Sequence, residues 1–261
     1  MPQAIEHDLD YRDRGLVVVL PEVQGATLQS LPSFLFKVFP KLEARVVRGG
    51  GVPIVMGRGI PYSALIGVDG TLLWAGHPSS GGKERDACIE AELKKVATGW
   101  GESLAAKKVR AQLYGKQDLA EAKKLIDALP DDPDAERQAL QGELAVAHAW
   151  RVRAVQALRD EARFVESKQA AQALKKSVAG EPEWETEATQ LLADFDAEAM
   201  TKELAAAKKV DVVLRAVRGK KVKLDVAERR LRAVAKSAAG TAAGTRAEQL
   251  ADALAAADKK R

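Results

Sequence analysis

The spacing of apolar residues along the chain changes character near Trp100. Before Trp100, short runs of β-branched and aromatic residues alternate with Gly and Pro, which is typical of strands and turns. After it, Ala, Lys, Glu and Leu recur at helical spacing. The pattern therefore predicts an α/β domain over residues 1–98, followed by an all-α region of helical hairpins over residues 99–261.

The first predicted strand is the continuous apolar run Gly15 to Leu20, which is rich in β-branched residues and is followed by Pro21. Such a run predicts a strand buried on both faces. The residues from Ile5 to Arg14 predict the end of a helix. Downstream, Ser30 before Leu31-Pro32 is an N-cap signal for a helix that ends near Pro40.

A glycine-rich segment, Arg48 to Gly51, predicts a flexible loop, and Val52 to Val55 predicts a short edge strand because its proline cannot donate to an inner ladder. Two clearer strands follow at Tyr62 to Gly67 and Thr71 to Ala75. They flank Val68-Asp69-Gly70, and Asp-Gly between apolar runs is a strong hairpin signal.

A helix is predicted from Lys83 to Ala97, with Ile89, Leu93 and Val96 on one face. We expect Trp74 to pack the hairpin against this helix rather than to contact a ligand, because large aromatic residues on strands usually belong to the core. His77-Pro78 is expected to end the second strand rather than to bind a metal.

The second region predicts several helices, separated by Gly and Pro. Their ranges are Ser103 to Tyr114, Leu119 to Leu129, Asp134 to Val178, Trp184 to Val217, Lys223 to Ala238 and Thr245 to Lys259. The predicted breaks lie at Gly115, Pro130 to Pro133, Gly180 to Pro182, Gly219 and Gly240 to Gly244. Two segments, Gly115 to Pro130 and Ala227 to Leu254, have the Ala and Leu spacing of tetratricopeptide-like repeats, without that repeat's full pattern at a fixed period. An α-hairpin array and a partly coiled-coil bundle both remain open.

Composition and charge narrow the possible partners. Apolar residues make up 46% of the chain, which is enough for a core, and 41 Lys and Arg against 37 Asp and Glu leave a charge of only +4. The densest basic segment is Arg215 to Lys236, which lacks interleaved aromatic residues. A solvated helix face or a contact to an acidic partner is therefore favoured there over nucleic-acid binding. No run approaches the length of a membrane span, and Met1 to His7 do not resemble a signal peptide.

Cysteine and histidine usage argues against metal and dithiol chemistry within these residues. Cys88 is the single cysteine, so no internal disulfide can form. It lies mid-helix among acidic neighbours that disfavour a thiolate, so we predict a small, partly buried side chain without chemistry. The histidines His7, His77 and His148 are too scattered to suggest a metal site, and no cofactor is predicted.

The segment Gly59-Ile60-Pro61, the strand after it, Val68-Asp69-Gly70-Thr71 and Leu72 to Pro78 together resemble the closing hairpin of thioredoxin-like proteins. The resemblance is strongest to TlpA/redoxin-type thiol-disulfide oxidoreductases and extends over residues 15–97. It implies a cis Pro61, with Ile60, Pro61 and Tyr62 shaping a groove for a protein substrate or partner. It implies no catalytic residue among those present.

The chain departs from that family at its start, where the family has a central strand and a Trp-Cys-x-x-Cys motif. Either the sheet closes up without the missing strand or the natural chain is longer. We favour the second, in which a late start codon or a clipped gene model has removed these elements and any export signal. With an upstream Cys-x-x-Cys, the resemblance implies an extracytoplasmic thiol-disulfide oxidoreductase. Without it, the alternative is a non-enzymatic scaffold that combines a redox-dead thioredoxin-like domain with helical repeats.

Overall fold

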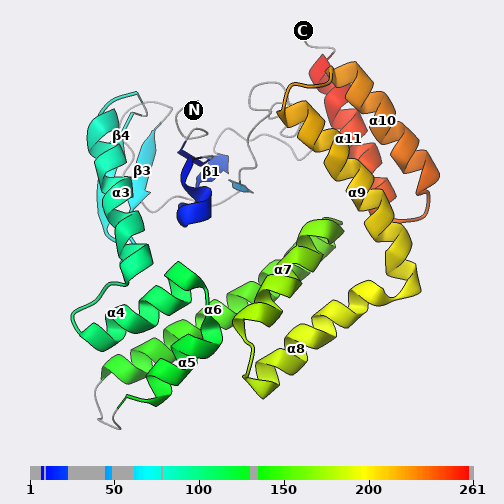
Figure 1. The fold of residues 1–261 in the computed structure, drawn as a ribbon. Helices are drawn as coiled ribbons and strands as arrows, with labels where there is room; N and C mark the ends of the chain where they lie inside the picture. Colours follow the sequence, from blue (N-terminus) through cyan, green and yellow to red (C-terminus); the bar gives the residue numbers. More distant parts are fainter. Residues whose placement is uncertain are drawn as a thin grey trace. The chain divides into compact units, whose positions relative to one another are not determined.

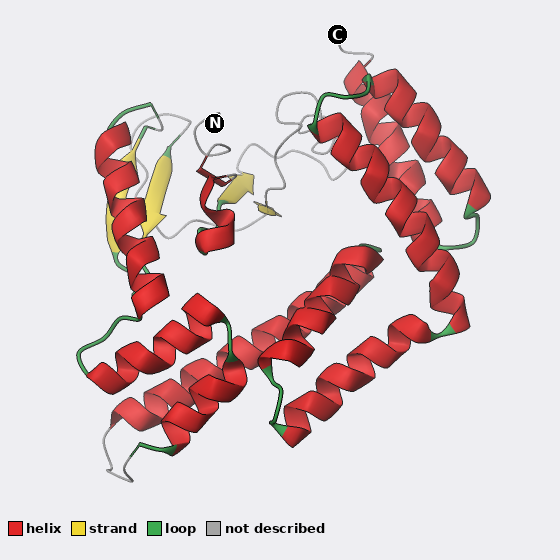
Figure 2. Cartoon of the chain, viewed as in Figure 1, coloured by secondary structure: helices red, strands yellow, loops and turns green. Residues whose placement is uncertain are grey.

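The computed structural model describes residues 7–8, 10–22, 45–48, 62–77, 79–129 and 135–258 (Figure 1). Within these ranges the chain is mostly helical, with two small two-stranded sheets (Figure 2). The predicted helix from Ser30 to Pro40, the predicted strand from Val52 to Val55 and the residues Ile60 and Pro61 lie outside the described ranges.

The amino-terminal part contains helical residues that end, as predicted, in the 3-10 turn η1 (Arg12–Arg14). Gly15 closes this turn in the left-handed region at φ 109°, where a residue without Cβ is favoured. Strand β1 (Val19–Glu22) then pairs in parallel with β2 (Arg45–Arg48), with Val19 opposite Arg45. Parallel pairing requires a crossover connection between the two strands.

Three expectations for this region were wrong. The strand begins later than Gly15 and continues through Pro21. Its one described neighbour is β2, and a strand paired on one side tolerates a proline because only half of its N–H groups need partners. Val17 and Val19 are 54% and 47% exposed, so this strand is not buried on both faces. Arg48, assigned to a loop, is the last residue of β2, whose sequence Arg-Val-Val-Arg lacks the apolar–polar alternation of a strand.

The predicted hairpin is confirmed. Strands β3 (Ser63–Ile66) and β4 (Leu72–Gly76) are antiparallel, with Leu65 opposite Trp74. At the turn, the Gly67 N–H donates to the Thr71 carbonyl at 2.8 Å. Gly70 adopts φ +83°, which explains the glycine of the Asp-Gly pair.

Helix α3 (Gly82–Thr98) lies along one face of this hairpin (Figure 2). Its buried face contains Ile89 and Leu93, with Val96 half-buried, as the spacing predicted. Trp74 packs toward α3, as expected. The guanidinium of Arg85, a residue of α3, lies 5.3 Å from the centre of the Trp74 ring. This contact combines apolar burial with a cation–π attraction.

The next helical hairpin consists of α4 (Leu104–Arg110), its π-helical continuation η2 (Ala111–Lys116) and α5 (Leu119–Asp127). Ser103 and Asp118 cap the two helices, since their side chains accept from the N–H groups of Ala106 and Glu121 at 2.9 Å. Gly115 was expected to separate the helices but lies inside η2. A Cβ there would come within 2.7 Å of the Val96 carbonyl oxygen, so this glycine permits close packing against α3.

Each of the two long helical runs predicted after Pro133 is divided in the structure, at a position that holds neither Gly nor Pro. The structure has α6 (Ala135–Asp160) and α7 (Phe164–Ser177) separated at Ala162, which is buried at φ +54°. Helix α8 (Pro182–Ala193) starts at the predicted Gly180–Pro182 break, and the turn η3 (Asp194–Asp196) then precedes α9 (Glu198–Arg218). Extended backbone at Ala197 interrupts the run predicted from Trp184 to Val217.

The last two helices, α10 (Leu224–Ser237) and α11 (Ala242–Asp258), form a tightly packed pair. Helix α11 begins before the predicted Thr245, because Gly244 belongs to the helix rather than to the break. A Cβ on Gly244 would lie 2.2 Å from the Ala238 carbonyl oxygen, so only glycine fits this approach. Fully buried Leu231 and Leu254 contribute to a core formed with residues of α7 and α9.

The described residues divide into two compact units, and the division falls inside α6, between Ala147 and His148. Unit 1 contains the two small sheets, α3, α4, η2, α5 and the first half of α6. Unit 2 contains the second half of α6 and the helices that follow. Beyond Thr98 the described chain is entirely without strands, in agreement with the all-α region that the sequence predicts.

Candidate functional site

Of the three predicted groove residues, the structure describes Tyr62 alone. Tyr62 immediately precedes β3 and is half-buried. Ile60 and Pro61 stand next to it in the sequence and lie outside the described ranges. The candidate site is therefore built from Tyr62, the hairpin that follows it and the helix α3 that supports the hairpin.

The hairpin has two different faces. Leu65, Leu73 and Trp74 are half-buried, whereas Ile66 and Leu72 are 54% and 50% exposed. Strand β3 pairs with β4 and with no other strand of the described ranges. The described part of the sheet thus presents an apolar outer surface and an open edge on β3.

Glu92 of α3 accepts a hydrogen bond from the turn between β3 and β4. Its side chain is buried, and Oε2 accepts a hydrogen bond from the Val68 N–H at 2.9 Å. Oε1 accepts from Lys95 Nζ at 2.5 Å. A Cβ on Gly67 would lie 3.0 Å from Glu92 Oε2, so a glycine at the end of β3 leaves room for the carboxylate. These two hydrogen bonds replace the hydrogen bonds to water that the Glu92 carboxylate loses on burial.

Cys88 lies in the middle of α3 and is half-buried. A helix stabilises a thiolate at its amino terminus, and Cys88 is well inside the helix. Since the sequence holds no second cysteine, the chain has no dithiol with which to carry out disulfide exchange internally. The position agrees with the sequence-based view of Cys88 as a packing residue.

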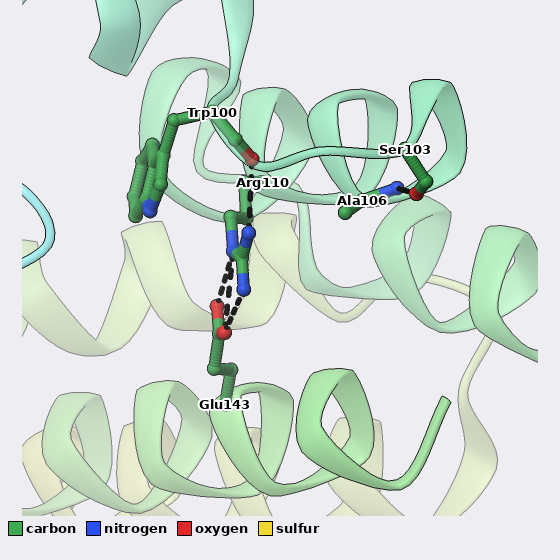
Figure 3. A network of polar contacts seen from close by, with 5 residues as sticks. All are labelled: Trp100, Ser103, Ala106, Arg110 and Glu143. Atoms are coloured by element: carbon green, nitrogen blue, oxygen red, sulfur yellow. Dashed lines mark hydrogen bonds and ion pairs between the residues drawn. The ribbon is translucent and has the colours of Figure 1, made fainter. Parts of the chain in front are cut away.

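A polar network that sequence reasoning missed joins α4 to α6 (Figure 3). The Arg110 guanidinium donates to both carboxylate oxygens of Glu143, with N–O distances of 2.5 to 3.2 Å, and to the Trp100 carbonyl oxygen at 2.9 Å. The hydrogen bonds to Glu143 raise the pKa of Arg110 above its ordinary value. The two residues are 33 positions apart, so no local pattern signals the pair.

An open cavity of about 640 Å³ lies in unit 1, where α3, η2 and the residues after η1 meet. Its lining includes Tyr114, whose ring is tilted by 36° against that of Trp100, with the two centroids 4.9 Å apart. Arg14, also in the lining, donates to both oxygens of Glu90 at 2.9 and 2.7 Å. These hydrogen bonds lower the pKa of Glu90. They also occupy the Arg14 guanidinium, which an anionic ligand in the cavity would need as its partner.

Unit 2 contains a group of partly buried charges on α7, α9 and α11. Burial and the neighbouring Arg163 lower the pKa of Arg246, whose Nη1 donates to the Ala162 carbonyl oxygen at 3.4 Å. Burial, together with the charge of Glu166, raises the pKa of Asp211. Basic and acidic side chains alternate here. They therefore form contacts between neighbouring helices and do not present a single sign of charge to a ligand.

The basic segment from Arg215 to Lys236 is partly neutralised by carboxylates. Arg229 pairs with Asp225, and Arg232 pairs with both Glu228 and Asp252 of α11 at 2.9 and 3.0 Å. Such exposed pairs are typical of a solvated helix surface. Within the residues that the structure describes, no group of His, Cys, Asp and Glu side chains is arranged to hold a metal ion.

No family model, curated protein or solved structure matches the chain. The thioredoxin-like resemblance therefore rests on the sequence segment from Gly59 to Pro78. Among the described helices, none has both the length and the apolar character needed to cross a membrane.

Proposed function

We propose that this chain is a protein-binding module of the thioredoxin-like lineage, related to TlpA/redoxin-type oxidoreductases, that has no dithiol chemistry of its own. The observation that carries the proposal is the placement of the single cysteine. Cys88 is half-buried in the middle of α3, the helix behind the hairpin, and has no second thiol to resolve a mixed disulfide. What remains of the lineage's function is the binding of an extended protein segment.

The order of the described elements supports this lineage. A parallel strand pair, β1 and β2, is followed by the antiparallel hairpin of β3 and β4 and by α3. The resemblance implies a strand, a helix, a hairpin and a final helix over residues 15–97, and the described residues include a strand, the hairpin and the final helix. Tyr62 begins the hairpin, and the resemblance assigns Ile60, Pro61 and Tyr62 to the binding groove.

The proposed binding mode is addition of an extended segment beside Ile60 to Tyr62. Extended peptides bind by main-chain hydrogen bonds to a strand edge, and side-chain pockets give specificity. Among the described residues no strand covers the second edge of β3, and this edge and the exposed apolar side chains of Ile66 and Leu72 are suited to such a segment. The helical pair α4–α5 of the same unit would add further surface, as hairpin arrays commonly do.

The absence of internal dithiol chemistry is tested with an insulin-reduction assay in the presence of dithiothreitol. We expect the wild-type chain and Cys88→Ser to give the uncatalysed rate. A rate well above the uncatalysed one that disappears in Cys88→Ser would show that the single thiol is catalytic, and the proposal would be wrong.

Binding is tested on an array of random-sequence decapeptides, followed by fluorescence polarisation with the best peptides. We expect Tyr62→Ala to weaken binding about tenfold, which corresponds to the loss of one aromatic contact of about 1.4 kcal/mol. Lys83→Ala, on the exposed start of α3, is the matched control and should bind like the wild type. Equal loss in both variants, or no peptide binding at all, would contradict the proposed groove.

Thiol-disulfide exchange is the second candidate, and the Gly59 to Pro78 segment is what favours it. It requires a Cys-x-x-Cys pair supplied from outside these 261 residues. Intact-mass analysis and amino-terminal sequencing of the protein from its source cells separate the two candidates. A longer chain with both cysteines would make the protein an oxidoreductase, with Ile60 and Pro61 next to the reacting sulfurs.

A further inference from the structure

Helix α6 has an exposed face that is almost free of charge. Val146 and Trp150 are 69% and 58% exposed, the highest and third-highest values among the large apolar residues of the described chain. Small residues continue the face at spacings of three and four, and each of them is exposed: Ala139, Gly142, Ala145 and Ala149. Residues so spaced share one side of a helix. A tryptophan in water beside such a stripe favours a partner surface over solvent.

Gly142 is the second, independent sign of a partner on this face. It lies inside a 26-residue helix, where glycine destabilises by about 1 kcal/mol relative to alanine. Within the chain nothing requires the missing side chain, because a Cβ on Gly142 would meet no atom within 4 Å. Gly115 and Gly244, in contrast, each receive a backbone carbonyl where their Cβ would be. Contacts within the chain do not explain why position 142 lacks a side chain, whereas close approach of another molecule would explain it.

The charges at the two ends of the face identify the partner. Glu136 lies near the start of α6 and Arg153 in its second half, and both are exposed. All exposed residues between them are uncharged. Trp150 follows Val146 by four residues, and Gly142 precedes it by four. Antiparallel pairing of two α6 helices about Val146 would therefore place each Trp150 over the Gly142 of the other copy, and each Arg153 one turn from the opposite Glu136.

We infer that this face of α6 binds the same face of a second copy of the chain in an antiparallel helix pair. The face is self-complementary in shape, since its largest side chain meets its open glycine. It is also self-complementary in charge, since its basic end meets its acidic end. One helix per copy makes a small interface, so we expect a dissociation constant on the order of 10 to 100 µM.

Sedimentation velocity over about 5 to 500 µM of the full chain tests the inference, a range that brackets the expected dissociation constant. We expect a reversible monomer–dimer equilibrium that Trp150→Ala and Gly142→Leu each weaken at least tenfold. Gly142→Leu fills open space and replaces glycine by a strong helix former, so thermal unfolding should show an unchanged or raised midpoint. A chain that stays monomeric, or dimers that both variants leave unchanged, would overturn the inference.

Charge reversal tests the antiparallel register separately. Glu136→Arg and Arg153→Glu should each weaken the dimer, and the double variant should restore it, because every copy then carries the pair in reversed order. Lys107→Glu, an exposed position on α4, controls for the change in net charge. A double variant as weak as the sum of the two single variants would exclude this pairing.

Discussion

At the scale of single residues, Arg110 shows how one side chain can connect three segments of unit 1. It lies on α4, binds Glu143 of α6 through paired hydrogen bonds and holds the carbonyl of Trp100 in the connection from α3 (Figure 3). Its guanidinium also lies 5.5 Å from the centre of the Trp100 ring. Arginine is suited to this position because its planar fork donates in several directions at once.

Replacing Arg110 by Gln should therefore destabilise unit 1 by about 1 to 3 kcal/mol, since the half-buried Glu143 loses its partner. Arg110→Lys should recover part of this loss, because lysine keeps the charge without the bidentate geometry. Urea unfolding of the wild type, Arg110→Gln, Glu143→Gln and the variant with both substitutions gives a double-mutant cycle. Additive losses from Arg110→Gln and Glu143→Gln would show that the pair is not coupled.

His148 is a second residue whose surroundings have a measurable effect. Its ring stacks on Trp184 of α8 with centroids 4.5 Å apart, and its Nε2 lies 3.4 Å from Glu187 Oε2. Burial lowers the pKa of His148, opposed by the carboxylate of Glu187 and assisted by the charge of Arg151. The folded state consequently binds the proton less readily than the unfolded state, whose pKa is near 6.5.

The sign of the pH dependence follows from that difference. Below about pH 6.5 the unfolded chain takes up a proton that the folded chain resists, so stability should fall as the pH drops from 7 toward 5. His148→Phe keeps a stacking ring without a titratable group. Its unfolding free energy should change less than that of the wild type over this range, as measured by urea titrations at each pH. Parallel curves for the two proteins would contradict the assignment.

At the scale of elements, the sequence predicted several features that a local chemical signal marks, although the signals at Pro21, Gly115 and Gly244 were misleading. The Asp69-Gly70 turn, the apolar face of α3 and the Gly180–Pro182 break are of this kind. The breaks at Ala162 and Ala197 contain no Gly or Pro to mark them. Ala162 is buried in left-handed backbone, whereas Ala197 is exposed in extended backbone. Around the hairpin, the sequence predicted the packing of Trp74, and the groove role of Tyr62 stays a prediction. Glu92 and Arg110 were missed because their partners are 24 and 33 residues away.

The same contrast between local and tertiary signals gives opposite predictions for two helical glycines. Gly115→Ala should destabilise by about 1 to 3 kcal/mol, because the new Cβ must displace backbone at 2.7 Å. Gly142→Ala should stabilise by about 0.5 to 1 kcal/mol, because it meets no atom and favours the helix. Thermal unfolding at low protein concentration measures both. Destabilisation by Gly142→Ala would mean that its site is not open.

At the scale of the whole molecule, the two compact units have separate sets of buried side chains. Leu113, Leu119 and Ile126 belong to the core of unit 1, and Leu231 and Leu254 to that of unit 2. Each set is buried within its own unit. A defect in one core should therefore loosen the helices of that unit first.

Leu231→Ala should destabilise unit 2 by about 2 to 5 kcal/mol, because Leu231 is fully buried and its removal leaves a cavity. Hydrogen–deuterium exchange should accelerate in α9, α10 and α11 and stay unchanged in α4 and α5. Leu113→Ala is the reciprocal variant and should produce the reverse pattern. Equal acceleration throughout the chain would show that the two units unfold as one.

Helix α6 also limits how the gene can be divided. The boundary between the units falls between Ala147 and His148, at the midpoint of this 26-residue helix. Expression of either half alone would leave 13 residues of α6 at the cut end, half of those 26, close to the roughly 12 to 15 residues below which an isolated helix is marginal in water. Fragments that overlap from Ala135 to Asp160 are therefore the ones to clone, because each then carries its own complete copy of α6.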